Sequence, residues 1–340
     1  MAKKVKLKDI ADHFNISCVT VSKALSDQKG VSEQMREEIK KYAQELGYQS
    51  PTEIKMKQAA KSYNIGVVVA ERYFARTQSF YWMLYQELAT KAVSKECFTL
   101  LEILPWQSEK ELTKPKLMDD TRVDGLVIMG SLSPKYISMI EQTIKVPYIF
   151  LDFYSKSGVS DSVISDSFYG MYKLVSHLIE NGHRNIAYVG TLMSTKSIND
   201  RYFGYCKACM ESGIPQSEIM VIPDRIRDDG SIFSPDKFVL PEKLPTAFAC
   251  NCDATAEVLM EVLTEKGYRV PEDVSIVGFD NYSSSSKNEN ITTYEVDVRE
   301  MARKTINTLI KKMSGEKYKK GNVIVEGRVV IKNSVNKITW

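Results

Sequence analysis

The order of apolar and polar positions near the N-terminus predicts two short helices joined by a tight turn. Residues 15–17 (Asn-Ile-Ser) interrupt the first helical repeat, and Ser17 is a suitable N-cap for the second helix. One face of the first helix, at i, i+3, i+4 and i+7 spacing, is formed by Leu7, Ile10, Ala11 and Phe14. The second helix is expected to bury Val21, Ala24 and Leu25. The strip that it turns outward consists of Cys18, Val19, Ser22 and Lys23.

This outward strip suits the recognition helix of a helix-turn-helix, whose N-terminal residues contact base edges in the major groove. Alternatively, Cys18 and Val19 pack within the bundle because both are small and apolar, although such side chains also fit thymine methyl groups. A third helix follows, with Ser32 as N-cap and Gly47 at a left-handed C-terminal position. Its buried stripe is expected to comprise Met35, Ile39, Tyr42, Ala43 and Leu46.

Residues 48–62 separate this bundle from the rest of the chain. The segment has a proline near its start, good helix formers and an apolar face too narrow to pack by itself. Because isolated helices of this length are marginal in water, we interpret it as a helix that forms only when it docks. Its composition is also compatible with a plain linker.

From residue 65 onward, short apolar runs alternate with amphipathic helical stretches. The runs predict strands at residues 65–70, 98–101, 125–129, 147–151, 186–189, 247–250, 274–279 and 329–333. The helical stretches include residues 81–93, 169–178, 202–210 and 254–263. This order predicts an α/β core of parallel sheets with helices on both faces. This alternation of strands and helices occurs twice, with a break near residues 160–165, which indicates two lobes. A ligand cleft is expected beyond the carboxyl ends of the strands.

Charge is distributed unevenly along the 340 residues. Residues 1–61 hold 12 Lys/Arg and 8 Asp/Glu, a net charge of +4, whereas the whole chain has a net charge of +3. The excess positive charge therefore lies in the helix-turn-helix segment, where it favours contact with phosphates. A solvated basic helix surface would show the same pattern.

The remaining composition indicates a protein of the cytoplasm without a cofactor. No apolar stretch approaches the roughly 20 residues that span a bilayer, and residues 1–10 lack the apolar core of a signal peptide. The six cysteines are expected to be thiols in a reducing compartment. Cys206, Cys209, Cys250 and Cys252 could in principle form a zinc site, but the first two fall on a predicted helix where buried thiols are ordinary core residues.

Four stretches are more specific than these patterns: residues 8–25, 31–48, 177–190 and 267–281. Together, in this order and spacing, they make the chain resemble the lactose-repressor/galactose-repressor (LacI/GalR) family of bacterial transcription regulators over nearly its whole length. The resemblance implies a homodimer whose N-terminal modules bind the half-sites of a pseudo-palindromic operator. It also implies a cleft that binds a small effector, for which we expect a sugar or sugar derivative.

The resemblance assigns DNA contacts to a set formed by Ser17, Cys18, Val19, Thr20, Ser22 and Lys23. Thr20 and Ser22 are the expected neighbours of phosphates or bases, and Cys18, Val19 and Lys23 form the expected base-reading set. Lys23 stands where the family often has arginine. Its ammonium cannot form the rigid bidentate fork to guanine, so direct readout is expected to differ.

In the family, the segment after the third helix becomes ordered on DNA and inserts a leucine into the minor groove. Here the family's tyrosine-x-proline is spaced more widely, at Tyr48 and Pro51, and the leucine position falls near Lys57 or Gln58. Met56 is the nearest apolar residue and is therefore the candidate wedge.

In the cleft, the family's ligand positions fall on Asp152, Arg201 and Asp280. Two carboxylates and a guanidinium can fork onto neighbouring hydroxyl groups of a sugar or a similar polar ligand. Alternatively, the aspartates cap loop amides at strand ends and the arginine is a simple ion-pair partner. Apolar walls for a ring would come from Phe80, Tyr81 and Phe153.

Asn251 and Asp253 complete the expected effector site. The family often has an asparagine directly before this aspartate, whereas here Cys252 occupies that position and Asn251 lies one residue earlier. A shift of one residue along a strand points the side chain the other way, so Asn251 is a candidate from the neighbouring position.

The expected organisation is a DNA-binding domain at residues 1–47, a hinge at 48–62 and a core at 63–340. Within the core, the N-lobe takes residues 63–162 and 295–325, and the C-lobe takes 163–294 and 326–340. A tetramer is not expected, because no leucine heptads follow the last strand.

An enzyme is not expected either. The three histidines, His13, His177 and His183, have no nucleophile or metal partner at a recognisable spacing. A periplasmic binding protein would share the two-lobed core but would need a signal peptide and no DNA-binding segment. A DNA-binding regulator without an effector, or an activator of the same fold, remains the alternative.

Overall fold

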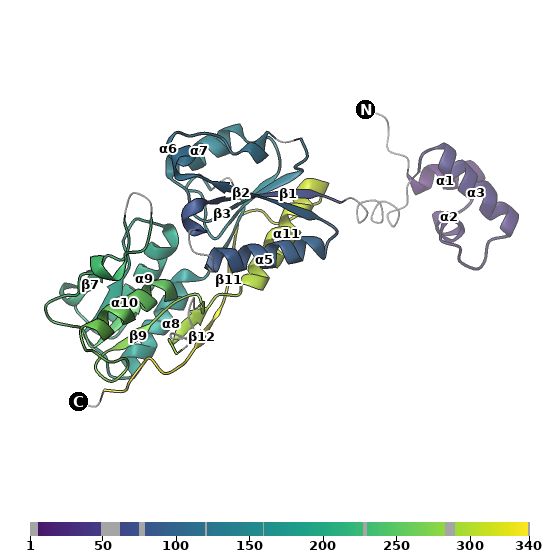
Figure 1. Ribbon diagram of the computed structural model, residues 1–340. Coiled ribbons are helices and arrows are strands. Elements are labelled where there is room, and N and C mark those ends of the chain that lie inside the picture. Colours follow the sequence, from purple (N-terminus) through teal and green to yellow (C-terminus); the bar gives the residue numbers. More distant parts are fainter. Residues whose placement is uncertain are drawn as a thin grey trace. The chain divides into compact units, whose positions relative to one another are not determined.

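The computed structural model describes residues 6–48, 62–74, 79–119, 121–158, 160–226, 230–282 and 290–338. The chain divides into two compact units, Met1–Ser62 and Tyr63–Trp340 (Figure 1). Within the described ranges, no helix combines the length and the apolar character that crossing a membrane requires.

The described part of the first unit is a three-helix bundle of α1 (Leu7–Phe14), α2 (Cys18–Leu25) and α3 (Glu33–Glu45). The turn after α1 forms because Asn15 adopts a left-handed φ of 49° and Ser17 Oγ accepts a hydrogen bond from Thr20 N at 3.1 Å. Its core is closed by Ile10, Val21 and Ile39, which have no exposed surface. The Ser32 side chain makes no capping hydrogen bond, contrary to expectation, although α3 begins directly after it.

The N-lobe of the second unit is built on a parallel six-stranded sheet of order β11-β5-β4-β3-β1-β2. Helices α5 and α11 pack together on one face, and buried residues of α7 pack against the other. The strands are β1 (Asn64–Ala70), β2 (Phe98–Leu104), β3 (Gly125–Met129), β4 (Tyr148–Leu151), β5 (Ser162–Ser165) and β11 (Asn322–Val325). The helices are α5 (Phe80–Val93), α6 (Trp106–Lys110), α7 (Pro134–Thr143) and α11 (Val298–Ser314).

The break between the two runs of strands, expected near residues 160–165, falls directly after them, because residues 162–165 are themselves a strand of the N-lobe. Ser162–Ser165 form β5, which pairs with β4 on one side and β11 on the other. The polar Ser162 and Ser165 hide this strand from a search for apolar runs, yet both are buried, and Ser162 Oγ donates to Asn322 Oδ1 at 2.8 Å. The chain therefore leaves the N-lobe sheet after Ser165.

The C-lobe contains a parallel four-stranded sheet of order β7-β6-β8-β9. Residues of α8 and α9 pack into the core cluster on one face and those of α10 into the cluster on the other. The strands are β6 (Ile186–Val189), β7 (Met220–Ile222), β8 (Ala247–Cys250) and β9 (Ser275–Val277). The helices are α8 (Ser167–Glu180), α9 (Lys196–Glu211) and α10 (Asp253–Glu265).

Short elements complete the second unit. An antiparallel pair joins β10 (Thr293–Glu295) to β12 (Arg328–Val330), so only the start of the expected strand at 329–333 is a strand. Short 3-10 helices occur at Glu71–Tyr73, Lys116–Met118, Gln216–Glu218 and Pro235–Lys237. The first of these follows β1 directly, and the residues after β1, β4, β7, β8 and β9 supply most of the polar groups of the site described next.

Candidate functional site

A cavity of about 240 Å³ lies between the two lobes of the second unit. Its N-lobe wall is formed by Arg72, Tyr73, Ser79, Phe80, Tyr81 and Asp152. Its C-lobe wall is formed by Thr195, Ser197, Ile198, Arg201, Arg225, Gly230, Ser231, Ile232, Asn251, Cys252, Ala254, Glu257, Asp280 and Tyr282. A cavity with a few convergent polar groups and aromatic walls is the usual form of a small-molecule site.

On the N-lobe wall, Asp152 follows β4 and is held by Tyr81 on α5. The Tyr81 hydroxyl donates to Asp152 Oδ2 at 2.7 Å, and the Tyr81 ring lies 4.1 Å from the ring of Tyr73. Asp152 has a left-handed φ of 65°, which directs its side chain away from the run of the strand. One carboxylate is thereby presented beside aromatic surface.

On the C-lobe wall, Arg201 of α9 is fixed by three partners. Its guanidinium donates to Asn251 O at 2.6 Å, to Asp280 Oδ1 at 3.3 Å and to Ser167 Oγ at 3.3 Å. It also lies 3.8 Å from the ring centroid of Phe279. These contacts fix the position of the guanidinium before any ligand arrives.

The two carboxyl groups have perturbed acidities. Burial raises the pKa of Asp152, while Tyr81 and Arg201 act in the opposite direction. Burial raises the pKa of Asp280 to about 7, with Arg201 opposing the shift and Asp152 adding to it. Perturbed acids that share a cavity are a frequent feature of ligand sites.

Asp280 is also held in an unusual backbone conformation. Its φ of 104° lies beyond the small left-handed region that non-glycine residues tolerate. The peptide is fixed by its N–H, which donates to Tyr294 O at 2.8 Å. Conformations of this kind cost on the order of 1–3 kcal/mol and cluster at ligand sites.

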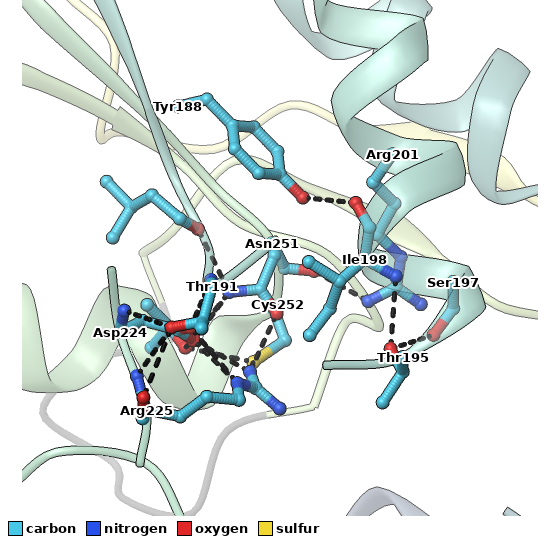
Figure 2. A network of polar contacts seen from close by, with 12 residues as sticks. Tyr188, Thr191, Thr195, Ser197, Ile198, Arg201, Asp224, Arg225, Asn251 and Cys252 are labelled. Carbon is cyan, nitrogen blue, oxygen red and sulfur yellow. Dashed lines mark hydrogen bonds and ion pairs between the residues drawn. The ribbon is translucent and has the colours of Figure 1, made fainter. Parts of the chain in front are cut away.

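A second polar network centres on Asp224, which is fully buried after β7 (Figure 2). Its carboxylate accepts two close hydrogen bonds from Arg225, at 2.7 and 3.0 Å, one from Thr255 Oγ1 at 2.6 Å and one from Thr191 N at 2.8 Å. Burial disfavours the charged form, but Arg225 and the hydrogen bonds outweigh it and lower the pKa of Asp224. Asp224 therefore remains ionised and fixes Arg225 against the cavity.

Asn251 lines the cavity, but its side chain is already engaged within this network. Its amide donates to Asp224 Oδ2 at 2.7 Å and to Val189 O at 2.9 Å, and its Oδ1 accepts from Arg225 Nη2 at 2.8 Å. Figure 2 shows Asn251 between Arg201 and Arg225. Its geometry is that of a positioning residue for the two arginines.

Two expected effector residues do not reach the cavity. Phe153 is 2% exposed and packs within the N-lobe, with its ring 4.5 Å from that of Phe150. Asp253 is buried at the start of α10, where it accepts hydrogen bonds from Thr293 Oγ1 at 2.7 Å and Tyr282 N at 2.8 Å. Phe153 serves the core, and Asp253 ties together three segments of the C-lobe.

Several lining residues were not predicted from the sequence, chief among them Arg72 and Arg225. Arg72 follows β1 and pairs with buried Glu109, with Nη1 2.5 Å from Oε2. The rule that ligand residues follow parallel strands points to it directly. Arg225 was missed because β7, the short strand before it, was not predicted, although residues 219–222 form a run of four apolar residues.

In the first unit, the strip expected to face DNA is exposed. Cys18, Ser22 and Lys23 are exposed, and Val19 is 64% exposed, so Cys18 and Val19 do not pack within the bundle. Thr20 is half-buried, and its Oγ1 lies 2.9 Å from Ser17 Oγ. Met56 lies outside the described residues.

Both units match known protein families. Residues 6–50 match the model described as bacterial regulatory proteins, lacI family, and residues 175–335 match that of a periplasmic binding protein-like domain. The PurR transcriptional repressor of Vibrio parahaemolyticus is 25% identical over 334 residues, which cover 98% of this chain and 99% of that protein. The PurR repressor of Glaesserella parasuis is 27% identical over 316 residues, covering 90% and 89%.

Solved structures share the fold. The lac repressor dimer bound to operator and the anti-inducer ONPF has a TM-score of 0.65 at 23% identity, covering 98% of this chain and all of that one. The transcriptional regulator CelR in complex with cellobiose has a TM-score of 0.67 at 20% identity, covering 97% and 99%.

The fold and the cavity define a class of protein, a two-lobed ligand-binding core joined to a helix-turn-helix. Its curated relatives are transcriptional repressors and not enzymes. The chain joins a helix-turn-helix domain of the lacI family of bacterial regulatory proteins to a periplasmic binding protein-like domain, and it is a DNA-binding transcriptional regulator.

Proposed function

We propose that this regulator is a repressor whose affinity for operator DNA is controlled by a small polar effector in the cleft cavity, a sugar or sugar derivative. The observation that carries the proposal is the convergence of Asp152 from the N-lobe with Arg201 and Asp280 from the C-lobe on one cavity. A ligand that contacts both walls binds a particular lobe arrangement best, and differential binding of this kind is what shifts a conformational equilibrium.

The chemistry of the cavity supports a polyhydroxy ligand. Sugar hydroxyl groups can donate to the carboxylates and accept from the guanidinium of Arg201. Phe80 and Tyr81 offer aromatic surface for the apolar faces of a ring. Solved neighbours described with cellobiose, ribose and D-xylulofuranose support the same class.

For DNA binding, we propose that the strip on α2 contacts the operator in the major groove, with Cys18, Val19 and Lys23 facing base edges and Ser17, Thr20 and Ser22 near phosphates. The exposure of the strip supports this assignment. A hinge at residues 48–62 with Met56 as minor-groove wedge remains part of the proposal.

We further propose a homodimer, because a pseudo-palindromic operator requires two recognition helices. Helix α5 is the interface candidate, since Trp82 is 38% exposed and Val93 is 61% exposed. The neighbour described as a lac repressor dimer bound to operator supports the assembly. Sedimentation of the full chain at micromolar concentration should give a dimer, and a monomer would contradict this part of the proposal.

The test of the effector site is a thermal-shift screen of sugars, nucleosides and their phosphates. A ligand at 100-fold its dissociation constant should stabilise the core by about 2.7 kcal/mol. The shift should be lost in Asp152→Asn and kept in Asp236→Asn, a matched change at an exposed position. If a ligand binds the cavity and leaves the affinity for selected operator DNA unchanged, the effector-independent alternative is correct.

A further inference from the structure

Two guanidinium groups, one from each lobe, face the same end of the cleft cavity. Arg72 lies on the N-lobe wall and Arg225 on the C-lobe wall. Gly230, which also lines the C-lobe wall, lies beside Arg72, since a Cβ at Gly230 would lie 3.3 Å from Arg72 Cδ. Burial raises the pKa of the Tyr73 hydroxyl, and the charges of both Arg72 and Arg225 oppose that shift, so both arginines act at one site.

Both guanidinium groups are permanently charged and held by buried carboxylates. Burial opposes the charge of Arg72, but Tyr73 and Glu109 outweigh it and raise its pKa. Burial opposes the charge of Arg225 in the same way, and Asp224 raises its pKa above the ordinary value. In Figure 2 one nitrogen of Arg225 points away from the Asp224 network. Each arginine is thus held by a carboxylate that does not line the cavity, while the arginine itself is part of the lining.

The N-terminus of α10 adds a third positive element at this end. Cys252 is the N-cap of this 13-residue helix, and its side chain contacts Thr255 Oγ1 and caps no backbone N–H, while Cys252 and Ala254 line the cavity. Arg225 Nη2 lies 3.8 Å from Cys252 Sγ, so the helix end and the guanidinium are neighbours. A helix N-terminus carries a partial positive charge and backbone N–H groups suited to an anion.

Three carboxyl groups, those of Asp152, Asp280 and Glu257, line the same cavity. Arg201 is paired with one of them, Asp280. The carboxylates that pair with Arg72 and Arg225, Glu109 and Asp224, are not part of the cavity lining. A neutral sugar offers these two guanidinium groups no charge.

We propose that the effector carries an anionic group, a phosphate or a carboxylate, that binds between Arg225 and the N-terminus of α10 on one lobe and Arg72 on the other. This inference rests on the proposed function and narrows its effector class to acidic sugar derivatives. An anion that contacts the arginines of both lobes at once holds the lobes together, so its binding favours the closed arrangement of the lobes.

The test is calorimetric titration of the full chain, at constant ionic strength, with matched pairs of probes. Glucose is compared with glucose 6-phosphate and with glucuronate, ribose with ribose 5-phosphate, and inorganic phosphate and acetate are titrated alone. We expect at least one anion to bind ten-fold or more tightly than its neutral counterpart, or inorganic phosphate or acetate to bind by itself. The phosphate and carboxylate series distinguish the two sources of the charge.

The double variant Asp224→Asn/Arg225→Gln removes the guanidinium without leaving a buried carboxylate unpaired. Its affinity for the anion should fall at least ten-fold more than its affinity for the neutral counterpart. The matched control is Asp273→Asn/Arg269→Gln, which removes an exposed pair of the same kind and should change neither affinity. Should the first variant not fold, Arg72→Gln/Glu109→Gln gives the same test from the other lobe.

The inference is wrong if no anion binds, if neutral probes bind as tightly as their acidic counterparts, or if both cavity variants keep the anion preference. The proposed function can be judged separately. A neutral sugar that binds and changes operator affinity while no anion does so would overturn this inference and leave the proposed function intact. If no probe that binds the cavity changes operator affinity, the proposed function fails as well.

Discussion

At the scale of single residues, Asp280 combines a strained backbone, a buried carboxyl and an ion pair with Arg201. The folded chain binds the Asp280 proton more tightly than the unfolded chain does, because burial raises its pKa from 3.8 to about 7. Protonation of Asp280 makes its full contribution to the free energy of unfolding below the pKa of the carboxyl in the unfolded chain. This contribution is lost as the pH rises through the pKa in the folded chain.

We therefore expect Asp280→Asn to flatten the pH dependence of stability. The carboxyl lowers the free energy of unfolding by at most about 1.4 kcal/mol per pH unit, from about pH 4 to about pH 7. Denaturant unfolding between about pH 5 and pH 8 measures the slope. Asp273→Asn is the control, since Arg269 lowers the pKa of that exposed carboxyl and keeps its titration below this range. Equal slopes for the wild type and Asp280→Asn would contradict the assignment.

Lys23 is the residue on which DNA discrimination is expected to depend most visibly. It is exposed on α2, so Lys23→Gln should leave the fold unchanged while weakening binding to selected operator DNA by about 1–3 kcal/mol. Fluorescence anisotropy against selected and mutated operators measures both affinity and discrimination. Lys266→Gln, an exposed lysine in the other unit, should have no effect. Unchanged discrimination in Lys23→Gln would remove this residue from the base-reading set.

At the scale of elements, the pair α8 and α9 depends on a close approach of their backbones. A Cβ at Gly204 would lie 2.1 Å from Phe168 O and 3.0 Å from Tyr172 N, both backbone atoms that cannot move aside. Gly204→Ala should therefore separate the helices and lower the free energy of unfolding by about 1–3 kcal/mol or more. Met210→Ala, at a position of α9 that is 70% exposed, should stay within about 0.5 kcal/mol of the wild type in the same unfolding measurement. A Gly204→Ala protein of wild-type stability would contradict this packing.

The elements that the sequence predicted are those with continuous apolar runs or a clear helical stripe. The helix-turn-helix and seven of the eight predicted strands agree with the structure to within a few residues, and the eighth is a strand only at its start. Strands β5, β7, β10 and β11 were missed. β5 begins and ends with buried serine, β7 and β10 have three residues each, and β11 alternates exposed and buried positions. Their pairing depends on neighbours far away in the sequence, which local patterning does not encode.

The residues of the cavity divide in the same way into those that the sequence predicted and those that it missed. Six of the eight expected effector residues line it, because they follow predicted strands or begin a predicted helix. Phe153 and Asp253 do not, since a side chain next to a strand end can turn either into the core or into the cleft. Arg225 could not be predicted, because it follows a strand that was itself missed.

At the scale of the whole molecule, the chain combines two compact units. The first carries an exposed recognition strip, and the second carries a cavity between two lobes. If a cavity ligand changes the affinity of the chain for operator by some factor, then thermodynamic linkage requires that operator changes the affinity for the ligand by the same factor. This reciprocity distinguishes a switch from two independent binding sites in one chain.

The most direct test of the central claim is the operator affinity of the full chain, measured by anisotropy with and without a saturating cavity ligand. We expect a change of about 5-fold to 150-fold, the usual range of allosteric coupling, matched by the change in ligand affinity when operator is bound. The change should disappear in Asp152→Asn. Operator affinity that is the same with and without a ligand shown to occupy the cavity would contradict the account.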